Sequence, residues 1–309
     1  MVKKKISAFF IIFCIITFLV GCGQKNINTN LSDLGGVYSV GMKDVNFDEE
    51  YSGSYSSKEG EASQETVQVS PNDQFSNKLL RWGILRKPDN KTPDADPGTP
   101  ALLEKYGGRY LGDVEKKEIY LTFDEGYENG YTGKILDALK ANNAKAIFFI
   151  TGPYLKEHQD LVRRMVEEGH EVGNHTIHHP SLPEIGDKEV EEELVGLDRA
   201  FSEKFGKNMR FLRPPKGEYS ERTLKISQKL GYCNLFWSFA YDDWNRNKVR
   251  GADYAYNIVM KNLHNGGVIL LHAVSKDNAD ALDRIIKGAV QAGYSIGDPN
   301  NLLKNGTNN

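Results

Sequence analysis

Side chains that could carry out chemistry collect directly behind the apolar segments of this sequence. Asp124 and Glu125 follow one such segment, and His175, Arg213 and His272 end three others. Carboxylate, imidazole and guanidinium groups can together transfer protons, hold a metal ion and stabilise negative charge. In parallel α/β folds the carboxyl ends of the strands and the loops beyond them form the ligand face. Four segments that end in this way predict a single pocket.

The stretch "NHTIHHP" contains a pair of histidines that could bind a metal. His175 and His179 are four residues apart, so a helical turn would place them on one face, whereas His178 has the wrong spacing. Two imidazoles are a usual way to hold a divalent ion, and a carboxylate from another strand end would complete the site. Zinc suits such a set, with cobalt or manganese as alternatives. Taken alone, such a pair favours a solvated helix surface, but here it follows directly on a strand and Pro180 limits any helix.

Three further residues could transfer or position protons. His272 follows the strongly apolar segment "GVILL", where it is either a hydrogen-bonded core residue or a proton donor whose pKa is tuned near neutrality. Asp243 in "DDW" could raise the pKa of that imidazole and fix its tautomer. Arg213 in "RPPKG" could hold a carboxylate through a two-pronged hydrogen bond.

The elements that must position these residues alternate along the chain. Short, almost continuously apolar segments with helical patterns between them predict an α/β fold with a parallel sheet or barrel. Expected strands lie at 118–123, 145–151, 171–175, 209–213, 233–239 and 267–272, and expected helices at 131–142, 155–168, 187–206, 220–230, 252–264 and 277–292.

The N-terminal region indicates export and anchoring. Three lysines precede an apolar run that ends in "LVGC", which resembles a bacterial lipoprotein signal over residues 1–21 with Cys22 as the lipidated residue. A plain signal peptide or an uncleaved anchor are the alternatives. Residues 23–75 contain nine acids and three lysines and lack periodic apolar spacing, so we interpret 22–78 as a lipidated Cys and a disordered tether rather than a small domain. The predicted location is extracytoplasmic, on the outer face of a bacterial membrane.

Composition narrows the function class. The 309 residues suffice for one sizeable core, here placed at 79–305, and we expect a monomer. The formal charge of −3 gives no indication of nucleic-acid binding. After processing, only Cys233 remains available, so we expect no intrachain disulfide and an inert buried thiol.

The motifs "TFDEG", "HTIHHP", "RPPKG", "DW" and "LLH", in this order, resemble the polysaccharide deacetylase (NodB homology) family, carbohydrate esterase family four. The resemblance covers about residues 79–305 and implies a (β/α) barrel of about seven strands with metal-dependent removal of N-acetyl groups from amino sugars. It also implies residue roles. By this resemblance, Asp124 is the general base, and His272, supported by Asp243, is the general acid. His175, His179 and Glu125 bind the metal. The backbone N–H of Lys216 helps to stabilise the oxyanion.

Departures from the family pattern point to one branch. Glu125 stands where the family has a second Asp, Lys216 where an aromatic is usual, and Ala240 where the fourth motif has its first Asp. With "GYENGYT" and "LLHAVSKDNADAL", these departures resemble the delta-lactam-biosynthetic de-N-acetylases of spore-forming bacteria. That branch implies hydrolysis of the N-acetyl group of N-acetylmuramic acid in peptidoglycan strands, leading to muramic delta-lactam in the spore cortex. The alternatives are an N-acetylglucosamine deacetylase and a catalytically weakened glycan-binding lipoprotein.

Overall fold

The computed structural model of this chain describes residues 74–304. The predicted signal peptide, Cys22 and the tether up to residue 73 lie outside the described residues. No helix within 74–304 has both the length and the apolar character that crossing a bilayer requires.

A curled parallel sheet forms the centre of the fold, as predicted. Its strand order is β10-β4-β5-β6-β7-β9, with β11 also paired to β4. A parallel bridge between Phe239 and Ile269 links the chain beyond β9 back to β10, so the sheet curls into a barrel. The strands are β4 (Glu118–Glu125), β5 (Ala146–Ile150), β6 (Glu171–Asn174), β7 (Phe211–Leu212), β9 (Cys233–Asn234), β10 (Gly267–His272) and β11 (Ser295–Ile296).

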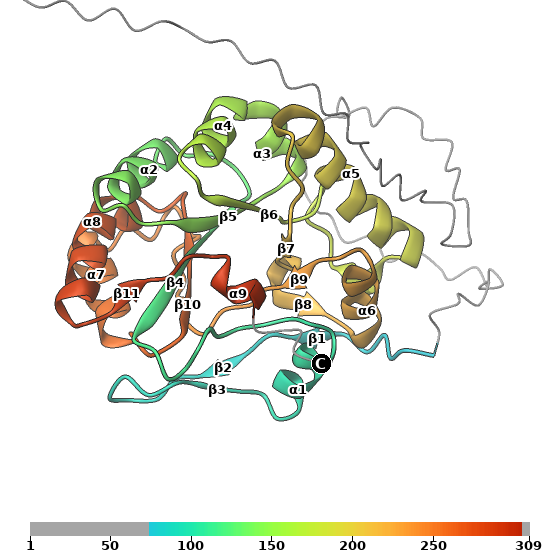
Figure 1. The fold of residues 1–309 in the computed structure, drawn as a ribbon, viewed down its shortest axis with the longest axis horizontal. Coiled ribbons are helices and arrows are strands. Elements are labelled where there is room, and N and C mark those ends of the chain that lie inside the picture. Colours follow the sequence, from blue (N-terminus) through green and yellow to red (C-terminus); the bar gives the residue numbers. More distant parts are fainter. Residues whose placement is uncertain (1–73, 305–309) are drawn as a thin grey trace, which may run out of the picture. The chain divides into compact units, whose positions relative to one another are not determined.

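Helices cover the outside of this sheet (Figure 1). The expected helices are present with one difference: the segment predicted as a single helix at 155–168 is two helices that meet at His158, whose backbone is not helical. The helices are α2 (Thr132–Ala141), α3 (Gly152–Glu157), α4 (Gln159–Glu167), α5 (Asp187–Phe205), α6 (Glu221–Lys229), α7 (Ala252–Lys261), α8 (Lys276–Gln291) and α9 (Asn301–Lys304), and short 3-10 turns lie at Leu182–Glu184 and Pro215–Gly217.

Both faces of the strands are buried, which explains their continuous apolar character. Along β4, Leu121 and Phe123 belong to the large core between the sheet and the helices. Tyr120 belongs instead to the small core inside the barrel, with Phe149 of β5. Because successive side chains of a strand point to opposite faces, Asp124 is directed to the barrel interior and Glu125 to the helical layer.

The segment before β4 packs along the barrel. It contains β1 (Leu80–Arg81), which pairs with β8 (Glu218–Tyr219), then β2 (Ile84–Leu85) paired with β3 (Asp94–Ala95), and α1 (Thr99–Lys105). The indole N–H of Trp82 donates a hydrogen bond to the carbonyl of Trp237 at 2.8 Å, and its ring stacks on Phe236. The chain therefore enters the fold beside the loop that follows Arg213.

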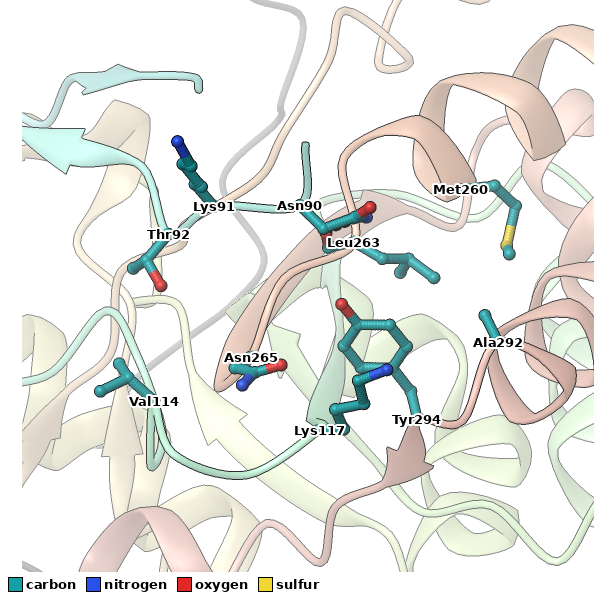
Figure 2. A pocket seen from close by; sticks show the side chains of 10 residues that line it. All are labelled: Asn90, Lys91, Thr92, Val114, Lys117, Met260, Leu263, Asn265, Ala292 and Tyr294. Carbon is teal, nitrogen blue, oxygen red and sulfur yellow. Dashed lines mark hydrogen bonds between the residues drawn. The ribbon is translucent and has the colours of Figure 1, made fainter. Parts of the chain in front are cut away.

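A cavity of about 570 Å³ opens at the amino ends of the parallel strands (Figure 2). Lys117 precedes β4 and Tyr294 precedes β11, and the Lys117 ammonium lies 5.6 Å from the centre of the Tyr294 ring. None of the predicted site residues lines this cavity. The predicted chemistry is located at the opposite ends of the strands.

Candidate active site

Asp124, at the end of β4, is the centre of a buried charged cluster. Its Oδ1 accepts a hydrogen bond from Nη1 of Arg213 at 2.7 Å, and its Oδ2 lies 3.6 Å from Nε2 of His175. Burial alone would raise the pKa of Asp124, but Arg213, followed by His175 and His272, outweighs it and holds this pKa below its usual range. Asp124 is therefore an ionised acceptor at neutral pH.

Arg213 follows β7 and is fully buried, so it does not reach a substrate. Its Nε donates to the carbonyl of Leu235 at 3.0 Å, and its guanidinium lies 4.1 Å from the centre of the Phe149 ring. The carboxylate predicted to be held by this arginine is that of Asp124. Arg213 is a positioning residue for Asp124 rather than a group that contacts the reacting atoms.

His175 and His179 come together, but not on a helical turn as predicted. The residues between them form an irregular loop in which Thr176 and His179 have positive φ angles of 69° and 60°. The Thr176 hydroxyl accepts the N–H of His179 at 2.9 Å and stabilises this loop. The two rings lie 4.8 Å apart between centroids. His178 points elsewhere and pairs with Glu193 at 2.7 Å.

Both imidazoles of this pair are held neutral. Burial lowers the pKa of His175 and lowers that of His179 to about 3. Nδ1 of His175 lies 2.8 Å from the carbonyl oxygen of Arg213, and since a carbonyl only accepts, Nδ1 carries the proton. Nε2 of His175 therefore presents its lone pair beside Asp124, which is the state in which imidazole binds metals.

His272, at the end of β10, forms a pair with Asp243. Nδ1 of His272 lies 2.7 Å from Oδ1 of Asp243, and the His272 backbone N–H donates to Oδ2 at 2.8 Å. Burial opposes the charge on His272, but Asp243 and then Asp124 outweigh it and raise the pKa of this imidazole. His272 and Asp124 are register partners on adjacent strands, so the two side chains start from neighbouring positions at the same edge of the sheet.

Asn278 is a site residue that no sequence motif indicated. Its amide nitrogen donates to Asp243 and to the carbonyl of His272, and its oxygen accepts from the Tyr241 hydroxyl. Asn278 is fully buried in the first turn of α8. A polar residue on the apolar side of an amphipathic helix was the one available signal.

Glu125 does not join the cluster, in contrast to the predicted metal set. Its side chain faces the helical layer, where Oε2 lies 3.4 Å from the hydroxyl of Thr132 in α2. Its Oε1 is buried without a hydrogen-bond partner among residues 74–304. Burial, followed by the neighbouring charge of Glu128, raises the pKa of Glu125 well above its usual range, which favours the protonated acid. The alternation of β4 thus separates two adjacent acids into different environments.

The side chains present fit a divalent metal only in part. Two neutral imidazoles, one with its lone pair directed to Asp124, are suitable donors. Within residues 74–304, however, no three His, Cys, Asp or Glu side chains are arranged to hold one ion. His175 and His179 are the two protein donors that the geometry offers, and Glu125 is not a third.

Comparisons with known proteins identify the family of this chain. A family model described as Polysaccharide deacetylase matches residues 111–235. The peptidoglycan-N-acetylmuramic acid deacetylase PdaA of Bacillus subtilis is 42% identical over 228 residues, which cover 74% of this chain and 87% of the relative. The chain belongs to the polysaccharide deacetylase family.

Two further comparisons extend this assignment. The solved structure of Bacillus subtilis PdaA, a family 4 carbohydrate esterase, matches with a TM-score of 0.72 and covers 74% of this polysaccharide deacetylase and 98% of that chain. A peptidoglycan-N-acetylglucosamine deacetylase of Bacillus cereus is 36% identical over 63% of this chain and 72% of the relative. The chain is therefore an amide-hydrolysing enzyme, and the predicted fold and enzyme class are confirmed.

The placement of Glu125 leads to a first prediction. In this polysaccharide deacetylase, Glu125→Gln should leave kcat/KM and the affinity for added zinc within a few-fold of wild type, because the side chain faces Thr132 in the helical layer and lies outside the cluster. Titration against a chromophoric chelator measures the affinity, and His179→Gln serves as a control that must lower it. A loss of more than about tenfold in the Glu125 variant would show that this side chain ligates the metal after all.

Proposed function

We propose that this deacetylase hydrolyses the N-acetyl group of N-acetylmuramic acid in peptidoglycan, and that it does so with a divalent metal. The single observation that carries the proposal is the buried arrangement of an ionised Asp124 beside a paired, proton-bearing His272 at one end of the barrel. The 42% identity to the Bacillus subtilis enzyme named for muramic acid supports the substrate.

Asp124 is the general base of the proposed mechanism. Its lowered pKa keeps it ionised, and Arg213 fixes one oxygen at 2.7 Å while the other stays beside His175. This second carboxylate oxygen accepts a proton from a water molecule while the oxygen of that water attacks the carbonyl carbon of the amide. A positioned base of this kind typically contributes about 10²–10⁴-fold to the rate.

His272 is the general acid. Asp243 holds Nδ1, which leaves Nε2 as the nitrogen that delivers a proton. The departing sugar amine needs that proton because an unprotonated amide nitrogen is a poor leaving group. The raised pKa of His272 keeps the imidazolium available near neutral pH.

His175 and His179 would hold the proposed metal, for which zinc is the best candidate and cobalt or manganese are alternatives. When bound, such an ion supplies Lewis acidity for the carbonyl and lowers the pKa of water. The turn at Lys216, whose φ is 58°, follows Arg213 and offers its backbone N–H to the developing oxyanion.

The test uses the purified chain with glycan strands that contain both amino sugars. We expect acetate release with loss of acetyl from muramic acid residues, abolition of that release by a chelator and recovery on adding zinc. Mass analysis of digested strands identifies the deacetylated sugar. Loss of acetyl from glucosamine residues alone would replace the proposed function by its alternative, and full activity after complete metal removal would refute the metal requirement.

The His272–Asp243 pair leads to a prediction on pH dependence. Asp243→Asn should move the alkaline limb of the kcat/KM profile to lower pH, because Asp243 raises the pKa of an acid that must be protonated to act. Part of the roughly 10²–10⁴-fold contribution of a positioned acid should also be lost.

A neighbouring carboxylate provides the control for that profile. Asp242 is paired with Lys248 and Arg250 at 2.8 Å each and forms no hydrogen bond or ion pair with His272, so Asp242→Asn should leave the alkaline limb in place. An unchanged limb in Asp243→Asn would show that His272 is not the acid.

We also propose that a lipid on Cys22 holds the enzyme at the outer face of a bacterial membrane, from which the tether lets the barrel reach peptidoglycan strands. The order of basic residues, apolar run and "LVGC" supports this location.

A further inference from the structure

The surface beside His272 carries two exposed aromatic rings and an arginine. Trp244 is 55% exposed and its ring lies 5.8 Å from that of His272. Tyr127 is 44% exposed, and the guanidinium of Arg246 lies 4.9 Å from the centre of its ring. We call Tyr127, Trp244 and Arg246 the arginine rim.

The arginine rim is tied to the catalytic residues through the chain. Arg246 is three residues beyond Asp243, and Tyr127 is three residues beyond Asp124, so each lies within about 11 Å of its partner along the backbone. The side-chain amide of Asn129 donates to the carbonyl of Val274 at 3.0 Å, which joins the Tyr127 loop to the loop after His272. The rim therefore borders the general acid.

Arg246 differs from the other cations of its loop. Lys248 and Arg250 both form ion pairs with Asp242. Arg246 is exposed and forms no ion pair with a carboxylate of residues 74–304, and its guanidinium lies over the Tyr127 ring. A guanidinium that lies over an aromatic ring keeps its N–H groups free in its own plane, where they can bind a carboxylate in a two-pronged manner.

We propose that Arg246 binds the carboxylate carried by the lactyl substituent of muramic acid and so selects this sugar over N-acetylglucosamine. The inference rests on the proposed function. The lactyl group is attached to the carbon next to the one that bears the acetamido group, so its carboxylate lies close to the catalytic centre when the amide is bound. N-acetylglucosamine has no such charge. The same carboxylate chemistry is present on the first residue of a stem peptide, in which case the lactyl group itself is neutral.

Matched pairs of oligosaccharides test this proposal with the full chain. The first pair bears a free lactyl carboxylate or its primary amide, and the second bears an alanine stub with a free carboxylate or its amide. For wild type we expect KM to be about tenfold lower for the charged member than for the amide member of one of the two pairs. Which pair shows this difference identifies the source of the carboxylate that Arg246 binds. In Arg246→Gln this difference should vanish while kcat stays the same.

Lys248→Gln is the matched control, because it removes one positive charge from the same loop but from a lysine that already has a partner. It should keep the wild-type preference. Lys216, the exposed cation of the turn after Arg213, is the alternative binding residue. If Lys216→Gln abolishes the preference for the charged oligosaccharide and Arg246→Gln does not, the assignment to Arg246 is overturned.

Calorimetric titration of the same oligosaccharides in an Asp124→Asn background should repeat the pattern in binding affinity without turnover.

The failure of this inference is distinguishable from the failure of the proposed function. If wild type removes acetyl from muramic acid but does not discriminate within either pair, or if Arg246→Gln retains the discrimination, only the role of Arg246 is refuted. If mass analysis finds acetyl lost from glucosamine residues alone, the proposed substrate is wrong and the role of Arg246 falls with it.

Discussion

Asp124→Asn should lower kcat by about 10²–10⁴-fold, the range that a positioned general base contributes. The amide retains an oxygen that can accept from Nη1 of Arg213, so the side chain should keep its position while losing the capacity to take a proton. KM should change little, because Asp124 acts on water rather than on the sugar. Acetate release under saturating substrate measures the effect.

Two measurements keep this result interpretable. Circular dichroism and thermal unfolding establish that the variant is folded, although it should be less stable because Arg213 loses its ionic partner. Zinc titration establishes that His175 and His179 still bind the metal. A folded, metal-binding variant that releases acetate within a few-fold of the wild-type rate would refute the role of Asp124.

The second large effect concerns stability. Arg213→Met should lower the free energy of unfolding by about 3–5 kcal/mol, because it leaves the carboxylate of Asp124 buried without its partner. The methionine retains apolar contact with the Phe149 ring, which now lies 4.1 Å from the guanidinium. Chemical denaturation at neutral pH measures the change, and the double variant Asp124→Asn/Arg213→Met should recover part of it because no charge remains to be paired.

The same variant should show a defined pH dependence. In wild type the pKa of Asp124 is lowered on folding. Its ionised form therefore stabilises the fold fully at pH values above the usual carboxyl pKa of about 3.9. This stabilisation is lost as the pH falls through the lowered pKa of the folded state. Without Arg213 the pKa rises, so the stability gap between wild type and variant should narrow in acid. The acidic limb of activity should move to higher pH. Additive single-variant effects and an unmoved limb would show that the two residues do not act as a pair.

The sequence predicted those parts of the site that depend on strand ends. Asp124, Arg213 and His272 each follow an apolar segment, and parallel strands bring their carboxyl ends to one edge of a sheet. The pairing of Asp243 with His272 was likewise predictable, since an acid and an imidazole both occur at this edge. Strand and helix positions followed from the alternation of apolar segments with helical periodicity.

The remaining parts depend on geometry that a motif does not specify. Whether Asp124 or Glu125 enters the barrel is decided by the pleat of β4, and a one-residue change of register would exchange them. The histidine pair relies on two positive φ angles rather than on the helical spacing that first indicated it. Asn278 reaches Asp243 from a helix 35 residues along the chain, a separation that sequence patterns do not encode.

The pairing of β1 with β8 has a consequence for shortened versions of this protein. Gly217 has a φ of 67°, and a Cβ there would lie 2.8 Å from the Trp237 ring and 3.4 Å from the Trp82 side chain, so the entering segment closes over the turn that carries Lys216. Trimming the chain to the boundaries of the family match at 111–235 would strip this cover from the oxyanion turn and also remove His272. A recombinant fragment intended to retain catalysis should therefore begin no later than Ser76, whose carbonyl already accepts the N–H of Arg222.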